Sequence, residues 1–137
     1  MLSQATGILS SISQRHRRNH MAAPVVWFEV AGRDLEALKS FYGELFGWTV
    51  DTANPMGYGM VDTGADGGIP GGIFAPGEDI EYVSFYVSVD DLAASLTKAE
   101  TLGAKVLQPP TPLDGGPTIA MVKDPGGHRI GLLQQPA

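Results

Sequence analysis

An internal repeat is the sequence feature that most constrains the fold of this 137-residue chain. A shift of 57 residues aligns seven pairs of identical residues at corresponding points of the hydrophobic pattern. The pairs are Phe28 with Phe85, Val30 with Val87, Asp34 with Asp91, Leu35 with Leu92, Ala37 with Ala94, Leu45 with Leu102, and Ile73 with Ile130. Self-similarity at a fixed offset is typical of a duplicated structural unit. The sequence therefore predicts two half-domains of similar structure.

Each half is predicted to contain a strand, a helix and three further strands. In the first half, the β-branched and aromatic run at 25–30 predicts a strand. A helix is expected at 35–46, with Asp34 as its N-cap and Gly47 as its stop. The other expected elements are strands at 48–50, 58–63, 72–75 and 81–87, a helix at 91–102, and strands at 104–108, 118–123 and 128–133, with a rigid proline-rich connection at 109–112. One helix covers only one face of such a unit, so the fold class is α+β.

Charge divides the chain into two regions. All fifteen acidic residues lie at or beyond Glu29, whereas three of the nine basic residues lie in the first twenty. We therefore predict a basic N-terminal extension at 1–21 and a domain at 22–137 with a net charge of −9, built from units at 24–76 and 80–135. A Ser- and Arg-rich, acid-free start is also the composition of an organelle transit peptide. We favour a simple extension and expect the protein in the cytoplasm.

Composition excludes several classes of protein. The chain has no cysteine, which rules out disulfides, thiol catalysis and cysteine-ligated zinc. Its net charge of −6 argues against a nucleic-acid partner, because such proteins bind phosphates with a basic surface. No apolar run approaches the ~20 residues that a membrane-spanning helix needs, so no membrane partner is expected.

Two segments of the chain resemble the vicinal oxygen chelate superfamily. The first is Phe-Glu-Val, Arg-Asp-Leu-Glu and Phe-Tyr-Gly-Glu-Leu-Phe-Gly-Trp within 28–48, and the second is Lys-Asp-Pro-Gly-Gly-His-Arg-Ile-Gly-Leu at 123–132. That superfamily includes glyoxalase I, bleomycin-resistance proteins, extradiol dioxygenases and fosfomycin-resistance enzymes. The resemblance covers roughly 24–135. It implies two βαβββ units that form a curved, barrel-like mixed sheet around a cavity, and a homodimer, since members of this size commonly pair two chains to complete their cavities.

Strand alternation predicts which side chains face that cavity. The core positions under the helices are expected to be Val26, Phe28, Val30, Val83, Phe85, Val87, Ile130 and Leu132. The cavity positions are then Trp27, Glu29, Tyr82, Ser84, Tyr86, Arg129, Gly131 and Leu133, and the 57-residue offset makes Phe74 the equivalent of Gly131.

The resemblance also implies where metal ligands would lie. Members of the superfamily place His and Glu ligands on the first and last strands of each unit, positions that correspond here to Trp27, Phe74, Ser84 and Gly131. None of these residues is a ligand for a divalent metal. His16 and His20 precede the domain, and His128 is expected at an exposed turn. We therefore expect neither a metal nor another cofactor.

A small-molecule pocket is the function that these positions favour. The predicted binding residues are Trp27, Glu29, Phe74, Tyr82, Ser84, Tyr86 and Arg129, with Trp48, Tyr58 and Met60 as possible extensions of the aromatic wall. An aromatic or planar ligand would fit such walls, as in the bleomycin-resistance branch, which sequesters its drug without chemistry. The acidic domain favours a cationic ligand. The alternative is that these aromatic side chains simply fill the space.

Glu29 is the candidate catalytic residue. A carboxylate among aromatic rings is partly desolvated, which suits general acid–base work in a metal-independent isomerase or lyase. Two alternatives stay open. In one, Glu29 pairs with Arg129 or caps a neighbouring backbone group, and only holds the halves together. In the other, the chain is a metal-dependent lyase or dioxygenase whose ligands come from a partner chain or from other positions.

Overall fold

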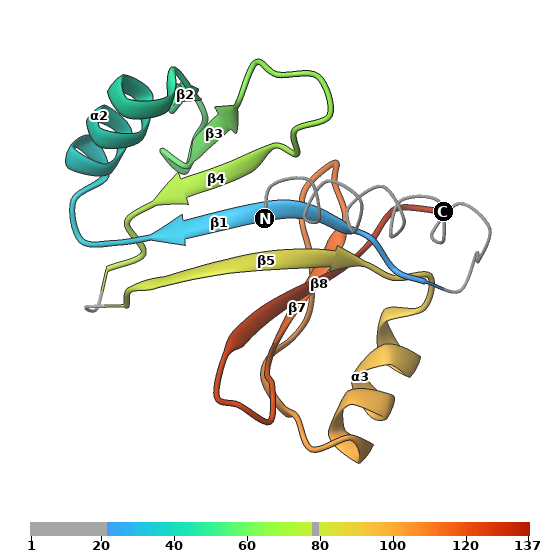
Figure 1. The fold of residues 1–137 in the computed structure, drawn as a ribbon. Coiled ribbons are helices and arrows are strands. Elements are labelled where there is room, and N and C mark those ends of the chain that lie inside the picture. The colour runs from blue at the N-terminus through green and yellow to red at the C-terminus, as the bar shows by residue number, and fades with distance from the viewer. Residues whose placement is uncertain (1–21, 78–79) are drawn as a thin grey trace, which may run out of the picture.

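The computed structural model describes residues 22–77 and 80–137, so the predicted extension at 1–21 lies outside the described residues. Within them, eight strands form one curved sheet in the order β2-β3-β4-β1-β5-β8-β7-β6 (Figure 1). The first unit consists of β1 (Val25–Ala31), α2 (Leu35–Phe46), β2 (Thr49–Asp51), β3 (Gly59–Asp62) and β4 (Gly71–Phe74). The second consists of β5 (Tyr82–Ser88), α3 (Leu92–Thr101), β6 (Lys105–Pro112), β7 (Thr118–Lys123) and β8 (Arg129–Gln134).

The two units are joined at the centre of the sheet by the antiparallel pair β1 and β5. Within each unit the first and last strands are parallel, β1 with β4 and β5 with β8. Phe28 lies directly opposite Phe85, its partner in the sequence repeat. An internal two-fold axis therefore passes through this pair. The predicted α+β duplication is confirmed, but the sheet is open, with β2 and β6 at its edges, rather than closed into a barrel.

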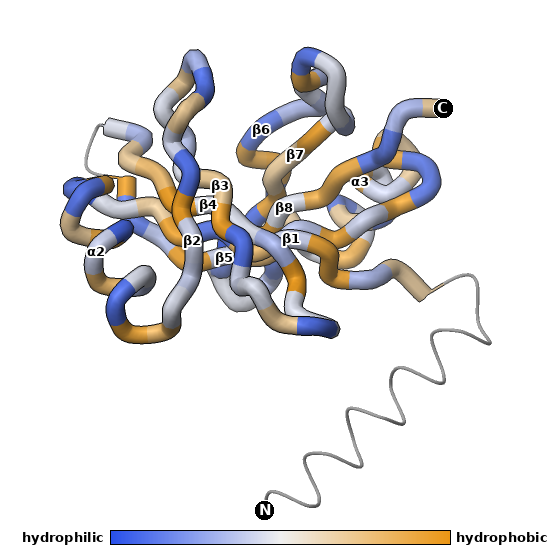
Figure 2. The backbone as a smooth tube through the Cα atoms, turned by 90° about the horizontal axis from the view of Figure 1, so that it is seen from above, coloured by the Kyte–Doolittle hydropathy of each residue, from blue (hydrophilic) through white to orange (hydrophobic). Residues whose placement is uncertain are grey.

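Both helices lie on the same face of the sheet, called here the outer face. Seen from above, the two units lie side by side with α2 and α3 at opposite ends of the molecule (Figure 2). The core under α2 contains Val30, Val50, Val61 and Ile73, and the core under α3 contains Leu92, Leu96, Ala120 and Val122. The opposite side, the inner face, has an apolar cluster of Tyr86, Met121 and Leu133. Among the described helices, none is long and apolar enough to cross a membrane.

The sequence signals at the helix ends work as expected. Asp34 accepts a hydrogen bond from the Ala37 amide at 3.0 Å, and its repeat partner Asp91 does the same for Ala94 at 3.0 Å. These N-caps satisfy amides that lack a partner within the helix. Gly47 ends α2 in the left-handed conformation, with φ of 74°, which favours glycine.

Two expectations about the strands are wrong. The proline-rich segment expected as a connection is part of β6, which tolerates Pro109, Pro110 and Pro112 because it lies at the edge of the sheet. Val26 does not pack under a helix. The β1 register shifts between Val25 and Trp27, and this bulge lets Val26 pack with the inner-face cluster.

The centre of the outer face is less covered than expected. Val83 and Phe85, expected in the core, are both exposed. The reason is the position of the helices: α2 contacts β2 and β4, and α3 contacts β6, β7 and β8, so neither helix covers β5.

The 57-residue offset does not hold to the end of each unit. Glu29 lies opposite Gly72, and its repeat equivalent Tyr86 lies opposite Gly131. Gly131 therefore corresponds to Gly72, and Phe74 corresponds to Leu133 rather than to Gly131. The second unit is two residues longer between its first and last strands, which displaces the alignment at this point.

Candidate functional site

The centre of the inner face is a buried carboxylate surrounded by tyrosine hydroxyls. Glu29, on β1, is only 5% exposed. Its Oε1 accepts hydrogen bonds from the hydroxyls of Tyr82 at 2.5 Å and Tyr86 at 3.4 Å, both on β5. Its Oε2 accepts one from Tyr58 at 2.8 Å. Both oxygens are thus satisfied, which a buried charge requires.

Tyr58 comes from the segment that precedes β3, and its neighbours hold it firmly. The indole Nε1 of Trp27 donates to the Tyr58 hydroxyl at 3.2 Å. The side chain of Asn54 bonds to both backbone polar groups of Tyr58. Its oxygen accepts a hydrogen bond from the Tyr58 amide at 3.0 Å, and its nitrogen donates one to the Tyr58 carbonyl at 2.6 Å. The segment is thereby fixed over the inner face by side-chain contacts.

Two equivalent glycines make room for these rings. A β-carbon at Gly72, on β4, would overlap the hydroxyl of Tyr58. A β-carbon at Gly131, on β8, would overlap the ring of Tyr86. Glycine is required at both positions because an aromatic ring lies directly against the backbone. In the sequence, a glycine in the last strand of each unit therefore indicated that a large ring lies across that strand.

The remaining aromatic residues continue this surface. The Phe74 ring lies 5.3 Å from that of Tyr58 and 6.3 Å from that of Tyr82, measured between ring centroids. The Arg129 guanidinium carbon lies 5.0 Å from the centroid of the Tyr82 ring, a cation–π distance. The structure therefore brings six of the seven predicted residues together as one surface: Trp27, Glu29, Phe74, Tyr82, Tyr86 and Arg129.

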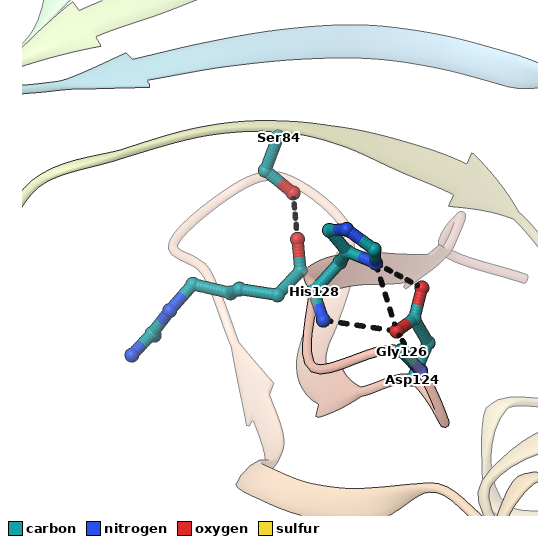
Figure 3. Close-up of polar contacts among 5 residues, drawn as sticks. Ser84, Asp124, Gly126 and His128 are labelled. Atoms are coloured by element: carbon teal, nitrogen blue, oxygen red, sulfur yellow. Dashed lines mark hydrogen bonds and ion pairs between the residues drawn. The ribbon is translucent and has the colours of Figure 1, made fainter.

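Ser84 and Arg129 have different partners from those expected. Ser84 is buried, and its hydroxyl donates to the Arg129 carbonyl at 2.5 Å, so it joins β5 to β8 (Figure 3). Within the part of the chain that the structure describes, Glu29 and Arg129 form no ion pair, and the partners of Glu29 are the three phenols. The alternative in which Glu29 pairs with Arg129 is therefore wrong.

His128 lies at the exposed β7–β8 turn, as expected. Its Nδ1 lies 3.1 Å from both carboxylate oxygens of Asp124 (Figure 3). Hydrogen bonds from the His128 amide and side chain, and from the Gly126 amide, lower the pKa of Asp124. This cluster shapes the turn and takes no part in the inner-face surface.

One of the suggested extensions of the aromatic wall lies elsewhere. Trp48 is on the outer side, where its ring stacks on Tyr42 at 5.4 Å. Met60, on β3, lies opposite Gly72, which in turn lies opposite Glu29, so its exposed side chain is on the inner face. A pocket of about 360 Å³ also lies on the outer side, between α2 and the start of β2; it is lined by Glu36, Lys39, Ser40, Gly43, Glu44, Trp48 and Val50.

The environment keeps the three phenols protonated. Burial, followed by the charge of Glu29 and the hydrogen bonds that it accepts, raises the pKa of Tyr58 and Tyr82 far above the ordinary value for tyrosine. The pKa of Tyr86 rises for the same reasons. The phenols are therefore hydrogen-bond donors to Glu29 at neutral pH.

The residues at the implied metal positions do not fit a metal ion. Trp27 and Phe74 carry no ligand atom, Gly131 and its structural equivalent Gly72 have no side chain, and the Ser84 hydroxyl is already bonded to a carbonyl. Among the described residues, no group of three or more His, Cys, Asp or Glu side chains gathers in a way that could hold a metal. His16 and His20 lie outside those residues, so the expected lack of a metal stays a prediction.

Comparisons with known proteins identify the family. The family model for the glyoxalase/bleomycin resistance protein/dioxygenase superfamily matches residues 19–132. The chain therefore belongs to this superfamily, as the resemblance of its two segments predicts. A similar curated relative is the anthracycline biosynthesis protein DnrV of Streptomyces peucetius, which is 28% identical over an alignment of 126 residues. The match covers 80% of this chain and 46% of that protein. The chain thus spans about half the length of this relative.

Solved structures show the same fold. A superfamily member from Vibrio splendidus 12B01 matches with a TM-score of 0.59 at 17% identity, over 82% of this chain and 99% of that one. The methylmalonyl-CoA epimerase from Mycobacterium tuberculosis matches with a TM-score of 0.59 at 16% identity, over 82% of this chain and 88% of that one. At such identities the likeness concerns the fold alone.

Proposed function

We propose that this chain binds a planar aromatic small molecule on the inner face of its sheet, over the tyrosines that surround Glu29. The observation that carries the proposal is the fixed position of the rings: Tyr58, Tyr82 and Tyr86 all bond to one buried carboxylate. Rings held in place in advance lose little conformational freedom when a ligand stacks on them. A rigid aromatic surface is therefore suited to a flat ligand.

The polar groups beside the rings support recognition of a functionalised ligand. The Tyr82 hydroxyl donates to Glu29, which leaves lone pairs on its oxygen for a donor on the ligand. Mostly apolar walls with a few placed polar groups are typical of small-molecule sites. The net charge of −9 on residues 22–137 favours a ligand with a cationic group. The Streptomyces peucetius relative is named for anthracycline biosynthesis, and anthracyclines are planar aromatic compounds.

Quenching of tryptophan fluorescence tests this proposal. A Trp48→Phe variant leaves Trp27, which contacts Tyr58, as the one tryptophan. Titration with proflavine, a planar cation, and anthraquinone-2-sulfonate, a planar anion, should give saturable quenching, with tighter binding of the cation. Tyr82→Ala in this background should weaken binding about 2- to 10-fold, because an aromatic contact contributes about 0.5–1.5 kcal/mol. Phe46→Ala, on the outer side, is the matched control and should bind normally. Absence of saturable quenching, or equal affinities in the Tyr82 and Phe46 variants, would overturn the proposal.

A second candidate function is a metal-independent isomerase or lyase in which Glu29 is the general base. The observation that favours it is the buried carboxylate directly beneath the same aromatic surface, with the Tyr82 hydroxyl 2.5 Å from Oε1. Glu29→Gln should then abolish deuterium exchange from heavy water into a bound carbon acid, and leave ligand affinity largely intact. If Glu29 is only structural, no exchange is seen with either protein and Glu29→Gln lowers the melting temperature.

Elemental analysis addresses the remaining alternative, a metal-dependent member. Protein purified without chelator should contain no stoichiometric divalent metal, because the implied ligand positions carry no suitable donors. A metal bound at one ion per chain would overturn this prediction and would direct attention to His16, His20 and residues contributed by a partner chain.

A further inference from the structure

Half of the basic residues of the domain lie on three neighbouring strands. Residues 22–137 contain six of the nine Lys and Arg residues of the chain. Three of the six are strand residues: Lys105 on β6, Lys123 on β7 and Arg129 on β8. The four strands of the second unit, β5 to β8, contain no Asp or Glu. These strands are therefore positively charged in a domain that is acidic as a whole.

The register of the sheet places the three basic residues in one row. Lys105 lies directly opposite Lys123, and Lys123 lies directly opposite Arg129. Neighbouring strands are about 4.8 Å apart, so the three backbone positions span roughly 10 Å. This group of Lys105, Lys123 and Arg129 is called here the cationic row.

All three side chains of the cationic row lie on the inner face. The Arg129 guanidinium lies over the ring of Tyr82, which belongs to that face. The chain neighbours of Lys105 pack against the core under α3, on the outer face, and Val122 belongs to that core. Successive strand residues point to opposite faces, so Lys105 and Lys123 point away from this core. The cationic row therefore begins at the edge of the proposed aromatic surface and continues to the edge of the sheet.

The acidic strand residues lie on the other part of the same face. They are Glu29, at the centre, and Asp51 and Asp62, which follow the outer-core residues Val50 and Val61 on β2 and β3. The strands of the first unit, β1 to β4, contain no Lys or Arg. The inner face is therefore polarised, with negative charge over the first unit and positive charge over the second.

The cationic row is unfavourable for the sheet on its own. Like charges directly opposite each other on neighbouring strands destabilise a sheet. Within the described part of the chain, the ion pairs lie at Arg33 and at the β7–β8 turn, and none involves the cationic row. Packing and charge pairing in the protein thus give no reason for three cations at these positions, whereas a bound anion would neutralise them.

A short phosphate chain fits the cationic row. Arg binds phosphate through its planar fork of donors, and Lys binds it as a compact charge. A row of roughly 10 Å is longer than one phosphate group and is comparable with a chain of several. An extended polyanion such as nucleic acid fits poorly, because the net charge of −9 on residues 22–137 repels it.

We propose that the cationic row binds the phosphate chain of a small ligand. Arg129 belongs both to the row and to the aromatic surface, so one molecule can place a ring over Tyr82 and phosphates along the row. This link between the two sites rests on the function proposed above, whereas phosphate binding by the row does not. A sulfonate attached directly to a ring over Tyr82 reaches Arg129 at most, because Lys105 lies two strands further away.

Isothermal titration calorimetry of the full chain with inorganic tripolyphosphate tests the proposal. The wild-type protein should show saturable binding that weakens as salt is added, because salt screens the charges. A Lys105→Gln, Lys123→Gln double variant should bind about 10-fold more weakly, because it lacks two exposed ion pairs with the phosphates. The matched control is Lys39→Gln, Lys98→Gln, which removes the same charge from α2 and α3. At an ionic strength of about 0.1 M it should keep the wild-type affinity, because charges more than ~10 Å away are screened.

Thermal unfolding gives a second measurement. Without phosphate, the Lys105→Gln, Lys123→Gln variant should be at least as stable as the wild type, because it lacks the repulsion between like charges. Tripolyphosphate should raise the melting temperature of the wild type more than that of the variant, since a ligand stabilises the folded state that binds it. A variant that melts below the wild type without phosphate would contradict the proposal, because the two lysines would then stabilise the sheet themselves.

Three calorimetric results would overturn the proposal. They are no saturable binding by the wild type, unchanged affinity in the Lys105, Lys123 variant, and an equal loss in that variant and in the Lys39, Lys98 control. The second result would assign the phosphates to another site, such as the basic segment at 15–20, and the third would assign the effect to net charge alone. Proflavine carries no phosphate, so its binding to the Lys105, Lys123 variant should not weaken. Failure of phosphate binding and failure of ring binding can therefore be told apart.

Discussion

Replacement of Tyr82 by phenylalanine should destabilise the protein by removing one hydrogen bond to a buried carboxylate. The Tyr82 hydroxyl lies 2.5 Å from Oε1 of Glu29, whereas that of Tyr86 lies 3.4 Å from the same atom. A hydrogen bond to a charged group contributes about 1.5–3 kcal/mol. Tyr82 is partly exposed, so water can replace some of this interaction, and we expect a loss of about 1.5–2 kcal/mol. Tyr86→Phe, which removes the longer contact, should cost less than about 1 kcal/mol.

Urea unfolding followed by circular dichroism measures these losses, provided that the variants share one m-value. A double-mutant cycle then assigns the effect to the carboxylate. In a Glu29→Gln background the bond is between neutral groups, whose contribution is about 0.5–1.5 kcal/mol, so Tyr82→Phe should cost less than in the wild type. The reasoning is refuted if Tyr86→Phe costs more than Tyr82→Phe, or if the cost of Tyr82→Phe is the same in both backgrounds.

Three further predictions concern the same fold. The phenols around Glu29 have raised pKa values, so phenolate absorbance should show them protonated above pH ~10, where free tyrosine ionises. Their stabilising contribution should be complete below that pH and should be lost as the pH rises further; normal titration of all tyrosines in the folded protein would contradict this. Gly72→Ala should lower the free energy of unfolding by about 1–3 kcal/mol in urea titrations, while Gly116→Ala should change it little, because a β-carbon there would meet Leu113 only at an ordinary contact distance of 3.8 Å. Asp34→Ala and Asp91→Ala should each cost about 1 kcal/mol in thermal unfolding, and unequal effects would show that the two caps are not equivalent.

Alternation along single strands predicted much of the inner face. Trp27 and Glu29 on β1, and Tyr82 and Tyr86 on β5, lie on the predicted face because a regular strand places every second side chain on one side. The face of Val26 was predicted wrongly because a bulge adds one residue to the strand. The sequence around Val26 has no glycine to indicate a bulge.

Contacts between distant segments were harder to predict. The hydrogen bonds from three tyrosine hydroxyls to Glu29 depend on the register between β1 and β5 and on the position of the segment that carries Tyr58. Local periodicity in the sequence predicts neither the register nor that position. Exposure of Val83 was missed for a related reason. Its residue type and alternation favour a core position, but the distance between the two helices decides whether anything covers it.

The two equivalent glycines show where the duplication is no longer symmetrical. At Gly131 the free space is taken by Tyr86, a residue of the sheet itself, whereas at Gly72 it is taken by Tyr58, from the segment before β3. One half of the proposed binding surface is therefore part of the framework, and the other half is attached to it through Trp27 and Glu29, with Asn54 holding the shape of the segment that carries Tyr58. We expect changes in that one segment to alter the ligand that the proposed surface accepts without disturbing a strand.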